Sequence, residues 1–195
     1  MSQIAADLPR RHRLSVADYY RMAEVGILSP DARVELIDGE IIDMAPIGRR
    51  HNATVSRLTK LFEVTVGNLA VVWPQNSIRL DNYSEPQPDI AVLRYRTDFY
   101  WSAQAGGADT LLIVEVAESS LRYDRDVKLP LYARHNVPEV WLVDINGRRL
   151  TRHRRPMQGR YTHVDEPDLG APLEIEAINQ VSVDLSELFP ASAAT

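Results

Sequence analysis

The segment Leu111–Ala117, with the sequence LLIVEVA, restricts the fold of this chain more than any other. Its length and its branched aliphatic residues predict a β-strand. Alternate residues of a strand lie on opposite faces, and both faces of this one are apolar, so other elements must cover each face. A second run of this kind, Glu139–Ile145 (EVWLVDI), follows later in the chain. Both strands therefore belong to a sheet with helices packed on it.

Helices and a hairpin are predicted from hydrophobic spacing. Apolar residues three and four positions apart predict helices at Ser15–Ala23, His51–Val66 and Asp124–Asn136. Alternating residues around Asp38-Gly39 predict a hairpin over Arg33–Met44. We expect the buried side of this hairpin to carry Val34, Leu36, Ile41 and Met44.

Short runs of branched and aromatic residues predict the remaining strands. They cover Leu69–Trp73, Ser77–Leu80, Asp89–Leu93 and Arg148–Arg155, and in the tail Leu173–Ile178 and Val181–Leu185. This order of elements predicts an α/β (α+β) fold with a mixed central sheet flanked by helices. We expect the tail to pair at a sheet edge or to close over the domain as a flap.

Composition excludes several classes of protein. The chain has no cysteine, which excludes disulfides, thiolate zinc sites, iron-sulfur clusters and a cysteine nucleophile. Its longest aliphatic run is too short to span a bilayer, and its first residues lack the apolar region of a signal peptide. We expect a cytoplasmic protein with one domain over residues 13–189 and flexible ends at residues 1–12 and 190–195.

The net charge of -5 is unevenly distributed. Residues 161–195 contain seven acidic residues and neither lysine nor arginine, so the rest of the chain is close to neutral. This distribution neither supports nor excludes a nucleic acid as partner. If the partner is DNA, the acidic tail must lie away from it, because its charge repels phosphates within a Debye length.

Two carboxylates on predicted strands are candidate metal ligands. Glu115 lies in the middle of an apolar strand, where an ionised carboxylate requires a partner unless this strand has one face in water. Asp89 begins the strand-like run after Pro88 (PDIAVLR), and alone could simply begin a strand. On neighbouring strands, the two would form the usual oxygen cradle for a hard cation such as Mg²⁺.

Lys128 is the third candidate. Of 22 basic residues, 20 are arginine, so a lysine is more often present for a compact ammonium with a tunable pKa. Asp124 precedes Lys128 by four residues and Tyr132 follows it by four, so a continuous helix would put all three on one face. An ordinary surface pair is the alternative for Asp124. Pro130 predicts a kink or a helix start near Asp126.

A cation beside two carboxylates and a metal can hold and acidify an attacking water, as hydrolysis of a phosphodiester requires. The ordered segments that carry this chemistry resemble the Uma-two family of putative restriction endonucleases, within the PD-(D/E)XK nuclease superfamily. These segments are VELIDGEIIDM, the helix that begins at His51, QPDIAVL, LLIVEVAESS and DRDVKLPLYARHNVPEVWLVD. The resemblance covers roughly residues 13–189, and it implies a restriction-endonuclease-like fold with an N-terminal helix and hairpin and a C-terminal β extension.

The resemblance also implies roles for five residues. Asp89 corresponds to the aspartate of the PD motif and Glu115 to its second acid, both metal ligands. Ala117 stands where the superfamily usually has lysine, so the resemblance implies that Lys128 supplies the ammonium instead. Glu35 corresponds to an early acidic residue, which implies an additional metal ligand or a hydrogen bond at the site, and Tyr132 corresponds to a helix tyrosine. Pro130 departs from the family pattern.

Other residues have weaker functional signals. His51 could contact phosphate or make a structural hydrogen bond at the start of its helix. The arginines of the hairpin after Asn146-Gly147 could follow a phosphate backbone or form a solvated strand pair. Trp73, Trp101 and Trp141 are expected in the core or at an interface.

The sequence thus predicts a Mg²⁺- or Mn²⁺-dependent endonuclease that acts on nucleic acid, most simply DNA, as a homodimer without membrane association. The dimer is expected because cutting both strands of a duplex with one site per chain needs two copies. An inactive, dimeric binding or scaffold protein with a nuclease fold is the alternative. A metal-dependent hydrolase of small phosphoesters is a third hypothesis.

Overall fold

The computed structural model describes residues 11–190, which fall into two compact units. The first unit comprises residues 11–44 with 81–86, and the second comprises residues 45–80 with 87–190. The predicted flexible ends therefore fall almost wholly outside the described residues. Within residues 11–190, no helix is long and apolar enough to cross a membrane.

The first unit contains one helix and one hairpin, both as predicted. Helix α1 (Val16–Glu24) begins at a capping box in which Ser15 and Asp18 satisfy each other's backbone N–H groups. Strands β1 (Val34–Ile37) and β2 (Glu40–Asp43) pair antiparallel. Asp38 and Gly39 connect them with φ of 50° and 83°, the positive values that a type I′ turn requires.

The buried side of this hairpin differs from the prediction. Leu36 is buried as expected, but the other buried residues of β1 are Glu35 and Ile37, while Val34, Ile41 and Met44 are only partly covered. Strict alternation fails because residues 81–86 belong to the same unit and cover β1, with a bridge between Leu36 and Glu85. Glu85 in turn accepts a hydrogen bond from the Tyr20 hydroxyl.

The second unit is built on a six-stranded mixed sheet with the order β3-β4-β5-β6-β7-β8. Its strands are β3 (Ala70–Pro74), β4 (Ile90–Arg94), β5 (Thr110–Ala117), β6 (Glu139–Asp144), β7 (Arg149–Met157) and β8 (Arg160–Asp165). Strands β5 and β6 pair parallel, and the other neighbours pair antiparallel. The two apolar runs identified in the sequence are thus the two central strands.

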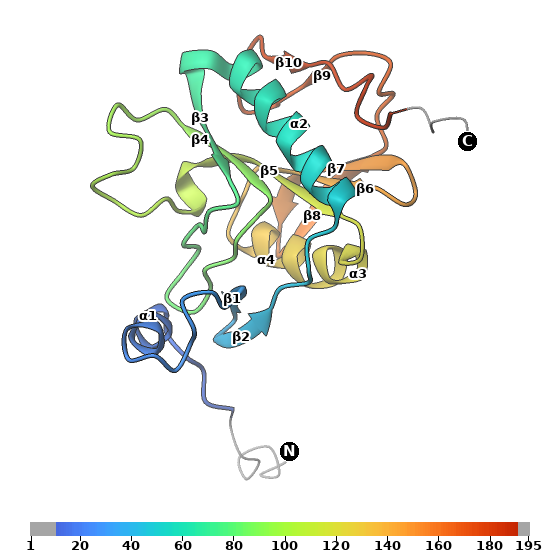
Figure 1. Cartoon of the computed structure of the whole chain (residues 1–195). Coiled ribbons are helices and arrows are strands. Elements are labelled where there is room, and N and C mark those ends of the chain that lie inside the picture. Colours follow the sequence, from blue (N-terminus) through green and yellow to red (C-terminus); the bar gives the residue numbers. More distant parts are fainter. Residues whose placement is uncertain (1–10, 191–195) are drawn as a thin grey trace, which may run out of the picture. The chain divides into compact units, whose positions relative to one another are not determined.

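Helices cover both faces of this sheet (Figure 1). Helix α2 (Arg49–Val66) packs on one face and continues into the 3₁₀ turn η2 (Gly67–Leu69). On the other face lies a continuous helical segment made of α3 (Leu121–Tyr123), the π-helix η4 (Asp124–Lys128) and α4 (Leu129–Arg134). The short 3₁₀ turn η3 (Gly107–Asp109) leads into β5. Both faces of β5 are therefore covered, as its composition predicts.

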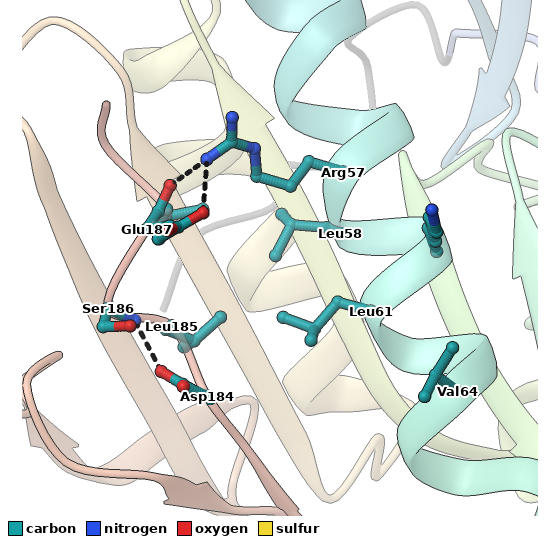
Figure 2. Close-up of a pocket in the computed structure, with 10 residues that line it drawn as sticks. Arg57, Leu58, Leu61, Val64, Asp184, Leu185, Ser186 and Glu187 are labelled. Carbon is teal, nitrogen blue, oxygen red and sulfur yellow. Dashed lines mark hydrogen bonds and ion pairs between the residues drawn. The ribbon is translucent and has the colours of Figure 1, made fainter. Parts of the chain in front are cut away.

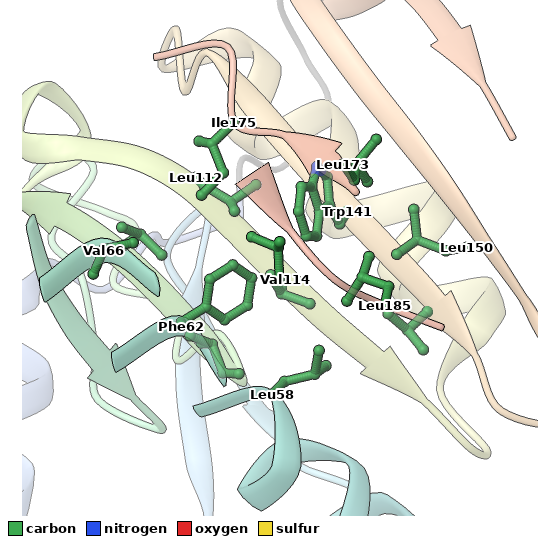
Figure 3. Packing of buried hydrophobic residues seen from close by; sticks show 14 of the residues in the cluster. Leu58, Phe62, Val66, Leu112, Val114, Trp141, Leu150, Leu173, Ile175 and Leu185 are labelled. Carbon is green, nitrogen blue, oxygen red and sulfur yellow. The ribbon is translucent and has the colours of Figure 1, made fainter. Parts of the chain in front are cut away.

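The core on the α2 face centres on an aromatic pair, Phe62 of α2 and Trp141 of β6, with ring centroids 5.6 Å apart (Figure 3). Both side chains are fully buried, so replacing Phe62 with alanine leaves a cavity. We expect Phe62→Ala to lower the free energy of unfolding by about 3–5 kcal/mol, measured by urea denaturation. Val64→Ala, on the exposed side of the same helix, should change it by less than about 0.5 kcal/mol. Equal losses in the two variants would contradict this packing.

The acidic tail packs on the same face as α2. Strands β9 (Leu173–Glu174) and β10 (Ser182–Val183) pair only with each other, and the apolar residues around them join the core of Figure 3. Buried Glu139 holds the tail to the sheet, because its carboxylate accepts the backbone N–H of Glu176 at 2.9 Å and the indole N–H of Trp141 at 2.7 Å. The tail thus forms a small covering sheet and adds no strand to the edge of the central one.

Three strand and helix predictions need correction. Ser77–Leu80 is not a strand and contributes only an isolated bridge between Arg79 and Gly106. Strand β8 was not predicted, because its residues alternate weakly and most are exposed. The third helix begins at Leu121, five residues before the predicted start near Asp126, and passes Pro130 without a break.

Candidate functional site

The two predicted metal ligands meet at the end of neighbouring strands. Asp89 immediately precedes β4, and the antiparallel register of β4 and β5 pairs Ile90 with Val114, so Asp89 comes opposite Glu115. The backbone N–H of Val116 donates to Asp89 Oδ2 at 2.8 Å, which holds this carboxylate beside β5. Glu115 is only 2% exposed. The burial contradicts the alternative in which Glu115 points into water.

Lys128 and Tyr132 both contact Glu115. The Lys128 ammonium lies 3.2 Å from Glu115 Oε1, and the Tyr132 hydroxyl donates to the same oxygen at 2.6 Å. Lys128 also donates to the backbone carbonyl of Gln87 at 3.3 Å, which connects it to the segment leading to Asp89. Both helix residues are buried. Lys128 therefore reaches the acidic pair from the helix, as the resemblance implied.

The π-helix explains how a proline-containing helix places Lys128 here. Pro130 has no N–H to donate and would clash with the carbonyl four residues earlier in an α-helix. The wider π turn of η4 lets the N–H of Leu129 donate to the carbonyl of Asp124, five residues back, and Pro130 then lies in the first turn of α4. The chain therefore continues through Pro130 with Lys128 turned toward the sheet.

Asp124 is a buried member of the same group of charges. It is 4% exposed and accepts a hydrogen bond from the Ser120 hydroxyl at 2.6 Å, so the surface-pair interpretation is wrong. Burial raises the pKa of Glu115 to about 8, because lost hydration outweighs the attraction of the Lys128 ammonium. The negative charges of Asp124 and Asp89 act in the same direction as burial. Glu115 thus lies within the electrostatic reach of two further carboxylates and of the Lys128 ammonium.

His51 has a larger part in this site than the sequence indicated. Its Nε2 lies 3.0 Å from Asp89 Oδ1, so the first turn of α2 reaches the acidic pair from the other side. No spacing rule connects a helix-opening histidine to an aspartate 38 positions later. The contact follows from the packing of α2 on the sheet, and it favours the structural hydrogen bond over the phosphate contact for this residue.

Glu118 was missed in the sequence and positions the start of α2. Its carboxylate accepts from Arg50 Nε at 2.9 Å and from the backbone N–H of His51 at 3.4 Å. Arg50 also donates to the side-chain oxygen of Asn146 at 2.7 Å, and Asn146 donates to the Glu118 carbonyl at 2.6 Å. These hydrogen bonds form a ring at the N-terminus of α2, where the positive end of the helix dipole stabilises the negative charge of Glu118. The signal in the sequence was an acid three residues after Glu115.

The donor atoms at the site fit a hard divalent cation. Within the described chain, the side-chain contacts of Glu115 both fall on Oε1, so Oε2 can accept a cation, and Asp89 presents a second carboxylate next to it. In residues 11–190, no three His, Asp or Glu side chains form a ready-made metal cage. Two carboxylates completed by water and substrate phosphate are the pattern that Mg²⁺ adopts in proteins.

Some candidate features lie outside this group. Glu35 is buried in β1 and belongs to the first unit, and its role as an additional ligand stays a prediction. The basic strand β7 is largely neutralised, since Arg152 and Arg154 both pair with Asp165 of β8. A groove of about 390 Å³ between α2 and the tail contains none of the predicted site residues (Figure 2).

Comparison with known proteins gives two matches. The family model Uma2, described as "Putative restriction endonuclease", matches residues 16–186. Among solved structures, the chain is similar to a putative nuclease belonging to DUF820 from Anabaena variabilis, with a TM-score of 0.67 and 14% identity. That alignment covers 90% of this chain and 97% of the other. A comparison with curated proteins gave no match.

The family match spans most of the chain and includes Asp89, Glu115, Lys128 and Tyr132, and the structural match extends over nearly the whole fold. The chain therefore belongs to the Uma2 family of putative restriction endonucleases and has a nuclease-like fold.

Proposed function

We propose that this protein is a metal-dependent endonuclease that hydrolyses phosphodiester bonds of DNA. The observation that carries the proposal is the convergence of Asp89, Glu115 and Lys128 from three separate segments. Burying this many charges together is unfavourable for stability. Such clusters are therefore found mainly where function requires them. A cytoplasmic location is part of the same proposal.

In this proposal, Asp89 and Glu115 would hold Mg²⁺ or Mn²⁺. When bound, such a cation stabilises charge on the phosphate and makes a bound water more acidic. The Lys128 ammonium lies within hydrogen-bond distance of Glu115, so it can orient a water at the acidic pair and stabilise the hydroxide by its charge. Tyr132 is a positioning residue, because its hydroxyl fixes the Glu115 carboxylate from within the core.

Purified protein incubated with plasmid DNA tests the proposal. We expect cleavage with about 5–10 mM Mg²⁺ or Mn²⁺, since a pair of carboxylates holds these ions weakly, and none when EDTA removes the metal. RNA and a small phosphodiester serve as competing substrates. Absence of divalent-dependent cleavage of any nucleic acid would overturn the proposal, and turnover of the small ester alone would favour a small-molecule hydrolase.

We further propose a homodimer, because one site per chain cuts both strands of a duplex most simply as a two-fold pair. Light scattering at micromolar concentration is expected to give twice the chain mass of 22.0 kDa. The placement of the tail agrees with a substrate path on the other face, since the tail packs with α2 while Glu115 faces α4. A monomer in light scattering would contradict the dimer and leave the cleavage proposal to its own test.

A further inference from the structure

The segment of residues 95–102 after β4, here called the aromatic loop, exposes three aromatic side chains. Trp101 is 93% exposed, Phe99 is 59% exposed and Tyr95 is 45% exposed. Trp141 thus lies in the core, whereas Trp101 does not, and the interface placement that was the alternative for Trp101 stays a prediction. A single exposed apolar residue needs no explanation, but three neighbouring aromatic residues on one loop indicate a binding surface.

Side-chain contacts within the aromatic loop hold it in this exposed conformation. Asp98 accepts two hydrogen bonds from the Arg96 guanidinium, both at 2.9 Å, and also binds the hydroxyl of Ser102. The Tyr100 hydroxyl donates to the carbonyl of Arg94 at 2.7 Å, and Arg96 stacks over the Tyr100 ring. Tyr100 therefore anchors the loop, while its neighbours on both sides are exposed.

The backbone of this loop is also strained. Phe99 and Tyr100 have φ of 48° and 63°, in the left-handed region that bulky residues rarely adopt. Such a conformation persists only where the surrounding contacts enforce it. The contacts of Asp98 stabilise this conformation. Trp101 is exposed as a result and has no role in packing. Strain of this kind is typical of functional loops.

The aromatic loop and the acidic site share one face of the sheet. Tyr100 packs in the same buried cluster as Ile113 and Tyr132, and Ile113 and Glu115, two residues apart on β5, lie on the same face of the sheet. The loop begins where β4 ends, whereas Asp89 lies just before β4 begins. At about 3.3 Å per residue, roughly 20 Å separate Asp89 from the loop, the length of about six stacked nucleotides.

The charge near the loop is suited to phosphates. Arg79 and Arg94 are exposed, and neither forms an ion pair with any described residue. Of the two nearby carboxylates, Asp98 is paired with Arg96, whereas Asp109 accepts the backbone N–H of Gly106 and keeps its negative charge. Flat aromatic faces beside unopposed guanidinium groups are how proteins hold unpaired nucleotides.

We infer that the aromatic loop is a stacking platform for unpaired bases of a nucleic acid, with Trp101 as its main contact. The inference rests on the proposed nuclease function and adds that the substrate is single-stranded, or locally unpaired, about six nucleotides from the scissile bond. The backbone phosphates would pass Arg79 and Arg94, and the strand would then run over the protein surface toward Asp89, because β4 itself is buried.

Binding of a fluorescein-labelled oligothymidylate of about 20 nucleotides, roughly three times the expected span, tests this inference without cleavage when anisotropy is measured in EDTA. Trp101→Ala is expected to weaken binding about tenfold, because stacking on an aromatic side chain contributes on that order for each base. Trp101→Phe should restore most of the affinity. The unlabelled oligonucleotide should quench tryptophan fluorescence in the wild type and leave it unchanged in Trp101→Ala.

Val64→Ala is the matched control, since Val64 is 77% exposed on α2, which packs on the opposite face of the sheet from Tyr100. This variant should bind the oligonucleotide like the wild type. Circular dichroism should be unchanged in all variants, because neither side chain is in the core. A duplex of the same length should lose little affinity when Trp101 is replaced, since its bases are already stacked on one another.

The outcomes separate this inference from the proposed function. Cleavage of DNA with unchanged oligonucleotide binding in Trp101→Ala would overturn the stacking platform and leave the nuclease intact. Binding through Trp101 without cleavage under any metal would support the platform and overturn the nuclease. No binding of the oligonucleotide by the wild type would overturn the platform, as would a Trp101→Ala variant that binds normally but no longer dimerises, which would assign the loop to contact with a second copy.

Discussion

Replacing Lys128 with alanine is expected to reduce divalent-dependent DNA cleavage by about 10²–10⁴-fold, the usual contribution of a positioned group that assists proton transfer. The reason is geometric, because the ammonium lies 3.2 Å from Glu115 and is the cation that acts on this carboxylate. Arginine cannot substitute, since its planar fork would not fit a site built for a compact ammonium. Cleavage of plasmid DNA under single-turnover conditions measures the effect.

The variant must be distinguished from an unfolded protein. Removing one partner of a buried ion pair costs up to about 3–5 kcal/mol, so Lys128→Met, which keeps the apolar stem, should accompany Lys128→Ala. We expect both variants to stay folded by circular dichroism and both to be inactive. Lys60, exposed on α2, is the only other lysine of the sequence and provides the control Lys60→Ala, which should cleave like the wild type. An active Lys128→Met would remove Lys128 from the mechanism.

Asp89→Asn and Glu115→Gln are each expected to abolish cleavage and to weaken Mn²⁺ binding by at least about 10- to 100-fold, because even outer-shell partners of metal ligands have effects of this size. Both substitutions keep the side-chain volume. In Asp89→Asn, the amide oxygen of the new side chain can still accept the N–H of Val116. Isothermal titration of Mn²⁺ into the metal-free protein measures the affinity directly.

Glu187→Gln serves as the control, because this carboxylate is 90% exposed and lies on the tail. It should leave the Mn²⁺ titration unchanged. If the wild type shows no Mn²⁺ binding that depends on Asp89 and Glu115, the site is not a metal centre. The inactive scaffold with a nuclease fold would then be the better description of this protein.

Much of the fold was predictable because burial patterns are local in sequence. The continuous apolar runs of β5 and β6 predicted that other elements cover both faces of the sheet. Apolar residues three and four apart predicted α2, the helix that covers one of these faces. The hairpin followed from Asp38-Gly39, which can adopt the positive φ of its turn. Prediction failed for Ser77–Leu80, which forms only a bridge to the distant Gly106, and for β8, whose mostly exposed residues alternate too weakly to indicate a strand.

The candidate site was predictable in part for the same reason. A carboxylate in the middle of an apolar strand can be recognised from the sequence as a candidate site residue, and so can a rare lysine in an arginine-rich chain. Glu118 and the contact of His51 with Asp89 were not predictable, because they arise where α2 packs against the ends of β4 and β5. The exposure of Trp101 could not be predicted either, because an aromatic residue in a loop has the same local sequence whether its side chain is buried or exposed.

Residue type and spacing were enough to identify the central strands and the charged groups that need partners, because these two properties set the cost of burial. How those groups meet depends on the packing of the folded chain. The π turn at Asp124–Lys128 directs the lysine past Pro130, and the register of β4 against β5 brings Asp89 opposite Glu115. The strand register and the contacts of Lys128 with Glu115 and Gln87 join segments that are separated in the chain, and no local pattern records their geometry.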